Sequence, residues 1–561
     1  MHFNISILVL NTTTCIDNIT DPVFNAAVQF VIIAAQAYNI RPAVFNTGFA
    51  VLNITLPFLN IHTPVKSAQP STFNLQPSYL RNMSFLPVYD VLKTAAEQWP
   101  GKPAVHDEQG SITFQELWVA TEQLREQLLA QGIRPGMGVG MMAHNGRNFI
   151  IGLFAVVGCG ATVMPIYHQL KKTEIDDILQ EAQLHAVIDD KSGIQPLETM
   201  QAEIGTAYGA FRVGFTINDN PLPYAAHVKE PAFVRFTSGT TGKSKGVIIS
   251  HQSVIERIEG ANHGLQLGPG DTVVWMLPMA YHFVVSIVLY IRYGAAIAVA
   301  KDFLARNIIA VTNQHNGTLL YASPMQIRLL ANDTGNEQMP TLKKAISTSA
   351  AISLDVCNTF KKRFGIDVSQ AYGIIEIGLP MMNFVKSAEH PDAVGYALPG
   401  YEVAMLDEEG NVLPKGETGQ LGIRGPGMFD AYLLPAQLRN DVLVNGYFLT
   451  ADYASMAPDG LIKIEGRAKS VINISGIKVF PEEVEAVIET YPGVAQARIS
   501  SMPHPLMGQL IEAEVVAEPA AVLDIEAILT YCKKRLSTFK APQRLKIVES
   551  LPMTATGKLK R

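Results

Sequence analysis

The chain has 561 residues, of which 48% are apolar and 17% charged, and its net charge is −6. This length indicates several structural units, and the apolar content excludes a largely disordered chain. With 44 basic against 50 acidic side chains, no basic surplus supports nucleic-acid binding. The four cysteines lie far apart without Cys-x-x-Cys spacing, which disfavours a disulfide scaffold or a zinc module and favours a reducing, cytoplasmic location.

Residues 1–82 differ from the rest of the chain in composition. The first 80 residues contain only four charged side chains, Asp17, Asp21, Arg41 and Lys66. The uncharged stretch 22–40 has about the length of a membrane span, but Asn and Gln side chains would form a polar stripe along one helical face. No Lys or Arg precedes it, which disfavours a secretory signal. A membrane or interfacial anchor stays open; the favoured alternative is sequence outside the functional fold, including a start at Met83.

From about residue 84, helical and strand patterns alternate. Residues 113–131 place Leu117, Leu124 and Leu128 at helical spacing, and Gly132 follows as a stop signal. Short apolar runs then recur between turn signals, at 186–188, 233–236, 273–277, 295–300 and 318–322. Strands separated by helices predict parallel β-α-β architecture.

The pattern changes near Tyr401. Residues 401–425 alternate around two turn signals, Glu409-Gly410 and Lys415-Gly416, as an antiparallel hairpin would. After Arg467 come a strand-like VINIS, a helix opened by Pro481, strands at 497–500 and 513–516, and a further helix. These elements suffice for a small α+β domain.

The strongest local motif is TSGTTGKSKG, at residues 237–246. Three glycines allow a close approach to an anion, while five hydroxyls and two lysines supply hydrogen-bond donors and positive charge for a polyphosphate. A Walker A loop needs four residues between its glycines, but only two separate Gly239 from Gly242. The spacing therefore excludes a Walker NTPase.

This loop resembles the nucleotide loop of the acyl-adenylate-forming superfamily of AMP-binding enzymes, which includes acyl-CoA synthetases. Further blocks follow in that family's order: YGIIE at 372–376, YFLTAD at 447–452, GRAK at 466–469 with Gly476 and PEEVE at 481–485, and PMTATGK at 552–558. The resemblance covers about residues 86–561. It implies an α/β fold with a large adenylate-forming domain over 83–468, containing parallel layered sheets and a small barrel-like β part, and a small mobile α+β domain over 469–561.

The resemblance also implies roles for individual residues. The phosphate loop would hold the β- and γ-phosphates of ATP, with Lys245 as its main cation and Thr237, Ser238, Gly239, Thr240, Thr241, Gly242 and Lys243 as its other members. Glu376 would bind Mg²⁺, which prefers oxygen ligands. Ser349, Ala350, Ala351, Tyr372 and Gly373 would form the adenine slot. Asp452 would bind the ribose, with Arg467 at the ribose or phosphate. Lys558 would neutralise charge in the adenylation step. Lys469 would be the hinge, and Ser475 and Gly476 would lie where the thiol of coenzyme A enters.

The family activates a carboxylate as acyl-AMP and then transfers the acyl group to a thiol. Tyr281 or His282 would be the gate to the acid. Gly378 lies in the apolar stretch 377–382, for which a fatty or other hydrophobic acid is expected. The alternative is that these residues simply form core. The alternatives are transfer to a carrier-protein phosphopantetheine supplied by a separate protein, and a nucleotide-binding relative with weak or no turnover. The last is motivated by three departures: Ile375 in place of Thr, Ala451 in place of Gly, and Thr348-Ser349 in place of two glycines.

Overall fold

The computed structural model describes residues 4–10, 49–55, 87–198, 200, 202–217, 220–237, 245–474, 477–504, 508–553 and 559. The chain divides into two units, Met1–Met83 and Ser84–Arg561. In the first unit, strands β1 (Asn4–Leu10) and β2 (Phe49–Thr55) pair antiparallel. The uncharged stretch 22–40 lies outside the described residues. The predicted domain limits at 82/83 and 468/469 stay predictions.

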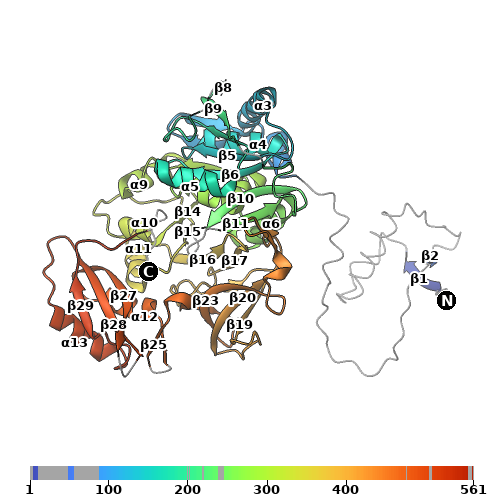
Figure 1. Ribbon diagram of the computed structural model, residues 1–561. Coiled ribbons are helices and arrows are strands. Elements are labelled where there is room, and N and C mark those ends of the chain that lie inside the picture. The colour runs from blue at the N-terminus through green and yellow to red at the C-terminus, as the bar shows by residue number, and fades with distance from the viewer. Residues whose placement is uncertain are drawn as a thin grey trace. The chain divides into compact units, whose positions relative to one another are not determined.

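The second unit contains two large sheets, each with a parallel centre (Figure 1). In the first sheet, β10, β6, β5 and β7 run parallel, and antiparallel strands extend both edges. Among the described residues its order is β22 (Gln437–Leu438), β21 (Ala431–Tyr432), β11 (Lys245–Ser250), β10 (Pro231–Thr237), β6 (Thr162–Tyr167), β5 (Gly138–Ala143), β7 (Ala186–Asp189), β9 (Gly209–Phe215) and β8 (Ala202–Thr206).

The second sheet has six neighbouring parallel strands, β16, β15, β14, β12, β13 and β3. Its order in the described part of the chain is β18 (Tyr396–Ala397), β17 (Gly378–Met382), β16 (Val368–Ile374), β15 (Lys344–Ser347), β14 (Leu319–Ala322), β12 (Thr272–Trp275), β13 (Ala296–Val299), β3 (Pro103–Asp107) and β4 (Gly110–Thr113). The five apolar runs singled out in the sequence become β7, β10, β12, β13 and β14, which confirms the parallel α/β architecture.

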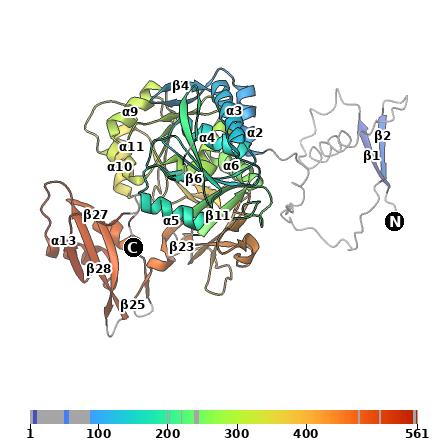
Figure 2. The ribbon, with the colours of Figure 1, turned by 45° about the horizontal axis from the view of Figure 1, so that its top comes forward.

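Helices pack around these sheets, as Figure 2 shows from a second direction. The predicted helix at 113–131 is confirmed as α3, which begins after a capping box formed by Thr113 and Glu116 and ends at Gly132 (φ 103°). The others are α2 (Val88–Gln98), α4 (Arg147–Gly158), α5 (Lys172–Ala182), α6 (His251–Leu265), α7 (Met279–His282), a π-helical turn (Phe283–Ile287), α8 (Val288–Arg292), α9 (Ala305–Gln314), α10 (Pro324–Ala331) and α11 (Leu354–Phe364).

A four-stranded antiparallel sheet follows, in the order β19 (Glu402–Leu406), β20 (Thr418–Arg424), β23 (Phe448–Met456) and β24 (Ile462–Arg467). β19 and β20 pair from Glu402↔Arg424 to Leu406↔Gln420, which confirms the predicted hairpin. β23 and β24 pair Asp452 with Arg467. This pairing brings together two residues that the sequence assigns to nucleotide binding.

The C-terminal part is a small α+β fold with its own hydrophobic core. It contains β25 (Ile472–Ile474), β26 (Ile477–Val479), α12 (Pro481–Ile488), β27 (Val494–His504), β28 (Gly508–Ala517), α13 (Ile525–Arg535) and β29 (Arg544–Ile547). Every predicted element of this part is present. Arg328 of α10 donates to the carbonyl of Ala495 and lies 3.6 Å from Glu489, so the small fold contacts the α10 surface.

No helix in the described residues combines the length and the apolar character needed to cross a bilayer.

Candidate active site

The predicted phosphate loop begins where β10 ends, at the carboxyl end of the parallel strands in the first sheet. Thr237 is the last residue of β10, and Lys245 is the first of the next strand, β11. Ser238, Gly239, Thr240, Thr241, Gly242 and Lys243 lie outside the described residues. Open α/β sheets bind ligands beyond the carboxyl ends of their parallel strands.

Lys245 and Glu376 both contact Tyr432. The Nζ of Lys245 is 4.6 Å from the ring centroid of Tyr432, and the hydroxyl of Tyr432 donates to Oε1 of Glu376 at 3.3 Å. Tyr432 is fixed on β21 by its register with Val247 of β11. The structure thus brings together the predicted loop cation and the predicted metal ligand, which are separated by 131 residues in the sequence.

Burial raises the pKa of the Glu376 carboxyl above its usual range, although the hydrogen bond from Tyr432 and the charges of Arg235 and Arg257 oppose the shift. No group of three or more His, Cys, Asp or Glu side chains suited to a metal exists among the described residues. Mg²⁺ is commonly held by one carboxylate together with substrate phosphates, so Glu376 beside the phosphate loop fits this cation. Bound there, Mg²⁺ would neutralise phosphate charge.

The turn that carries Glu376 is held by a buried arginine of α6. Arg257 is 0% exposed, and its guanidinium donates to the carbonyl of Ile375 at 3.0 Å and to that of Gly427 at 2.9 and 2.6 Å. Burial lowers its pKa to about 10, so it stays charged at neutral pH. Such a buried cation persists because these carbonyls satisfy it, and it fixes the backbone next to Glu376.

Asp452, Tyr372 and Arg467 form a second cluster. The Tyr372 hydroxyl donates to Oδ2 of Asp452 at 2.5 Å, and Nε of Arg467 lies 2.8 Å from Oδ1. Asp452 is 2% exposed, whereas Arg467 is exposed. Burial, followed by the charge of Asp452, raises the pKa of Tyr372 well above its usual value. A carboxylate held between two donors suits binding of ribose hydroxyls.

Backbone packing at Gly373 explains its identity. A Cβ at this position would lie 2.6 Å from the carbonyl oxygen of Gly378, so the β16–β17 hairpin closes here only with glycine. Of the other predicted adenine-slot residues, Ser349 is half-buried, and Ala350 and Ala351 are exposed, in the loop after β15. This loop and Tyr372 come from neighbouring strands, β15 and β16.

Two departures from the family pattern fall on left-handed backbone. Ala451 has φ of 61°, and Ser349 has φ of 77°. Both stand where the family has glycine, and glycine adopts this conformation without the steric cost that Cβ imposes. The replacements therefore place local strain beside Asp452 and beside the adenine slot.

We expect Ala451→Gly to stabilise the protein. Relief of left-handed strain should raise the free energy of unfolding by about 1–2 kcal/mol. The greater freedom of glycine in the unfolded chain should lower it by about 0.4–1 kcal/mol, which leaves a net stabilisation. Urea unfolding should show a higher midpoint for this variant. Ala350→Gly is the matched control, because Ala350 is exposed and is not left-handed, and it should lower the midpoint slightly. A lower midpoint for Ala451→Gly would contradict the strain argument.

The sequence left the gate residue open between Tyr281 and His282, and the structure separates their surroundings. The Tyr281 ring packs against Tyr167 at 5.3 Å and beneath the guanidinium of Arg235 at 4.9 Å. His282 packs edge-on against Trp275 and Tyr321. Gly378, the third predicted substrate residue, is buried with φ of 98° and packs on Arg257. The apolar stretch that follows it forms β17, whose Leu379, Met381 and Met382 belong to the main hydrophobic core.

The remaining predicted residues are Lys469, Ser475, Gly476 and Lys558. Lys469 is exposed in a short 3₁₀ turn directly after β24, between the four-stranded sheet and the small fold. Ser475, Gly476 and Lys558 lie outside the described residues. Their roles at the thiol entrance and in adenylation stay predictions.

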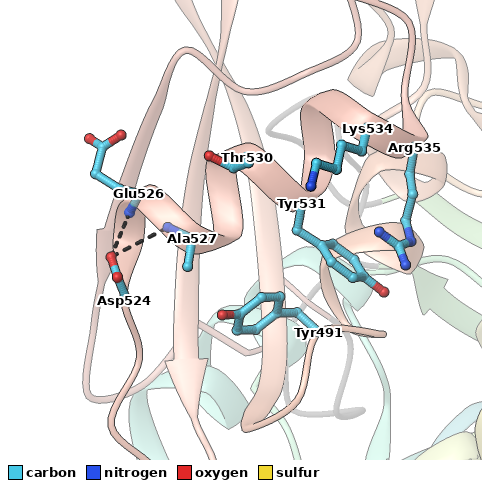
Figure 3. A pocket seen from close by; sticks show the side chains of 8 residues that line it. All are labelled: Tyr491, Asp524, Glu526, Ala527, Thr530, Tyr531, Lys534 and Arg535. Carbon is cyan, nitrogen blue, oxygen red and sulfur yellow. Dashed lines mark hydrogen bonds between the residues drawn. The ribbon is translucent and has the colours of Figure 1, made fainter.

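A hollow of about 410 Å³ on the small fold is separate from these clusters (Figure 3). It lies between Tyr491 and α13, where the rings of Tyr491 and Tyr531 meet edge to face and Arg535 covers Tyr531. Its lining residues are Tyr491, Asp524, Glu526, Ala527, Thr530, Tyr531, Lys534 and Arg535. None of the predicted site residues lines it.

Sequence reasoning missed three residues of the site, Arg235, Arg257 and Tyr432. A signal for the first was present, since an arginine interrupts the otherwise apolar FVRF strand. Arg257 has an ordinary helical context, so only the fold shows that it turns inward. Tyr432 lies outside the family's motifs, and it comes close to Glu376 only because β21 pairs with β11.

Comparison with known proteins agrees with this geometry. The sequence matches the AMP-binding enzyme family over residues 92–433 and the C-terminal domain of AMP-binding enzymes over residues 483–558. The chain therefore belongs to the AMP-binding enzyme family, which confirms the family and the fold class that its motifs predict.

Three similar proteins illustrate the range of this family. The chain is 26% identical to a fatty acid–[acyl-carrier-protein] ligase, ScoC, from Streptomyces coeruleorubidus, over 83% of this chain and 93% of the relative. It is 26% identical to a sulfoacetate–CoA ligase from Cupriavidus necator, over 84% and 96% of the two chains. The fold resembles o-succinylbenzoate CoA synthetase from Bacillus subtilis with its acyl-adenylate, with a TM-score of 0.75, 21% identity, and coverage of 85% and 97%.

Proposed function

We propose that this enzyme is an ATP-dependent acid–thiol ligase. The carboxylate oxygen of the acid attacks the α-phosphorus of ATP and releases pyrophosphate, and a thiolate then attacks the acyl carbon of acyl-AMP and releases AMP. The observation that carries the proposal is the convergence of two clusters at β16 and the turn after it. Tyr372 joins Asp452 and Arg467, and Glu376 joins Tyr432 and Lys245.

The two clusters suit different parts of ATP. Asp452, fixed by Tyr372 and Arg467, would accept hydrogen bonds from the ribose hydroxyls. Lys245 and the loop before it would bind the phosphates, and Glu376 would supply the carboxylate for Mg²⁺. Reactions at phosphorus of this kind depend mainly on positioning and charge neutralisation, which is what these groups provide.

Coenzyme A is the proposed thiol substrate, supported by relatives named as CoA ligases. A carrier-protein phosphopantetheine is the second candidate, because one relative is named as an acyl-carrier-protein ligase. For the acid, the sequence favours a fatty or other hydrophobic acid, and relatives named as acting on fatty acids support it. The apolar stretch behind that expectation contributes core residues in β17, so this stretch does not by itself identify the acid.

Pyrophosphate release from ATP and Mg²⁺, measured over a panel of fatty, aromatic and short polar acids, tests the proposal. We expect acid-dependent release, and thioester formation when coenzyme A is added. If thioester formed only with a phosphopantetheinylated carrier protein, that protein and not coenzyme A would be the acyl acceptor. No pyrophosphate with any acid would instead indicate a nucleotide-binding relative without turnover.

A further inference from the structure

Arg235 carries a largely buried positive charge, and no Asp or Glu among the described residues forms an ion pair with it. It lies on β10, two residues before the start of the predicted phosphate loop. One terminal nitrogen donates to the backbone carbonyl of Tyr281. Its Nε is buried without a hydrogen-bond acceptor in the described part of the chain. A buried guanidinium left in this state is costly unless an anion joins it.

The surroundings of Arg235 place it at the acid side of the site. Its guanidinium covers the ring of Tyr281, one of the two predicted gate residues, with 4.9 Å between its Cζ and the ring centroid. Glu376 acts on it only at longer range, and burial lowers the pKa of Arg235 to about 10, which leaves it charged at neutral pH. The residue keeps partial solvent exposure.

Aromatic rings pack around His282, the other predicted gate residue. Trp275 and Tyr321, register partners on β12 and β14, stack with 5.6 Å between centroids and are 0% and 2% exposed. His282 packs edge-on against both rings. An acid that passes Tyr281 therefore meets bulky side chains at the carboxyl ends of these strands. This packing favours a short acid over a long alkyl chain.

We propose that the acid substrate is short and carries a second anionic group, a carboxylate or sulfonate, which Arg235 binds. The inference rests on the proposed ligase function, and it replaces the hydrophobic acid that the sequence favours with a short dianionic one. Because the buried guanidinium can donate to two oxygens of one anionic group, it would discriminate against a neutral substituent of the same shape. Rejection of the neutral analogue follows because its binding leaves the buried cation without a partner.

Matched pairs of acids test this specificity. Succinate and 4-methylpentanoate differ by a carboxylate against an isopropyl group of similar shape, as do malonate and 3-methylbutanoate; sulfoacetate provides a sulfonate. We expect pyrophosphate release with kcat/KM at least about 100-fold higher for one or more of the dianionic acids than for the neutral partner. Hexadecanoate should be a poor substrate.

Arg235→Met assigns the preference to this residue. We expect this variant to have a kcat/KM about 100-fold lower for the dianionic acid, while its kcat/KM for the neutral partner changes little. Arg235→Lys should have an intermediate kcat/KM for the dianionic acid. Arg424→Met is the control, since Arg424 is exposed and pairs with Glu402 on the four-stranded sheet. Circular dichroism and equilibrium binding of a non-hydrolysable ATP analogue show whether each variant folds and binds nucleotide.

Three results would overturn the inference. One is a wild-type preference for hexadecanoate or the neutral acids, which keeps the ligase function but removes the anionic substrate. Another is an equal loss for both members of a pair in Arg235→Met with weaker nucleotide binding, which assigns Arg235 to ATP. The third is an unchanged preference in that variant. If none of the acids in the panel gave pyrophosphate release, the ligase function itself would be rejected.

Discussion

Replacement of Lys558 by alanine is expected to abolish acyl-AMP formation while sparing thioester formation from synthetic acyl-AMP. The resemblance places this lysine where charge builds between the carboxylate and the α-phosphate. Loss of one group positioned for such charge costs roughly 100- to 1,000-fold in rate. In the thiol step the family turns the small domain away from this position, so the same substitution should not affect it.

Two assays on one preparation measure this difference: ATP–pyrophosphate exchange for the first step and CoA thioester formation from synthetic acyl-AMP for the second. Lys534→Ala is the matched control, because Lys534 is exposed on α13 of the same small fold. Equal losses in both assays would contradict the use of two domain orientations. Unchanged exchange would remove Lys558 from the adenylation step.

Glu376→Gln is expected to lower activity and to stabilise the protein. The substitution removes the proposed Mg²⁺ ligand, for which we expect a rate loss of roughly 100- to 1,000-fold. Stability changes in the opposite direction because burial raises the folded-state pKa of Glu376. Such a carboxyl favours the folded state when it is protonated, at pH below its unfolded pKa, and this contribution is lost as pH rises through the raised folded pKa.

Thermal unfolding without ATP or Mg²⁺ measures this effect. Glu376→Gln should have a higher Tm than the wild type at pH 7–8, and the difference should shrink toward acid pH, where Glu376 is also neutral. Glu402→Gln is the control, since Glu402 is exposed and pairs with Arg424 on β19–β20. A lower Tm at pH 8 for Glu376→Gln would show that the ionised carboxylate stabilises the apo fold.

The sequence predicts most of the fold because its patterns are local. Helix α3 carries its own capping box and glycine stop, and the β19–β20 hairpin carries its own turn residues. For the site, the sequence predicts only those residues that stand in the family's motifs. Tyr372, Glu376 and Asp452 stand in recognisable blocks, and the structure places them in two hydrogen-bonded clusters.

Residues outside the motifs could not be assigned, because their roles depend on distant packing. Arg257 reaches Gly427, 170 positions away, and whether an arginine on a helix faces solvent or backbone carbonyls is decided by what packs on it. The apolar run 377–382 shows a second limit of the sequence. Buried strands and acyl pockets share the same composition, and β17 contributes its side chains to the core.

The left-handed backbone at Ala451 and Ser349 was likewise beyond sequence patterns, because φ follows from the surrounding strands and loop. The family resemblance marked both positions as substitutions of glycine, and the structure shows left-handed backbone at both, the conformation that glycine adopts most readily.

ATP–pyrophosphate exchange without any thiol tests the central claim most directly. If the enzyme forms acyl-AMP, labelled pyrophosphate should enter ATP only when a carboxylic acid and Mg²⁺ are present, and Asp452→Asn should reduce the rate through weaker ATP binding. Exchange that is independent of the acid, or absent with every acid in the panel while ATP still binds, would contradict adenylation of a carboxylate.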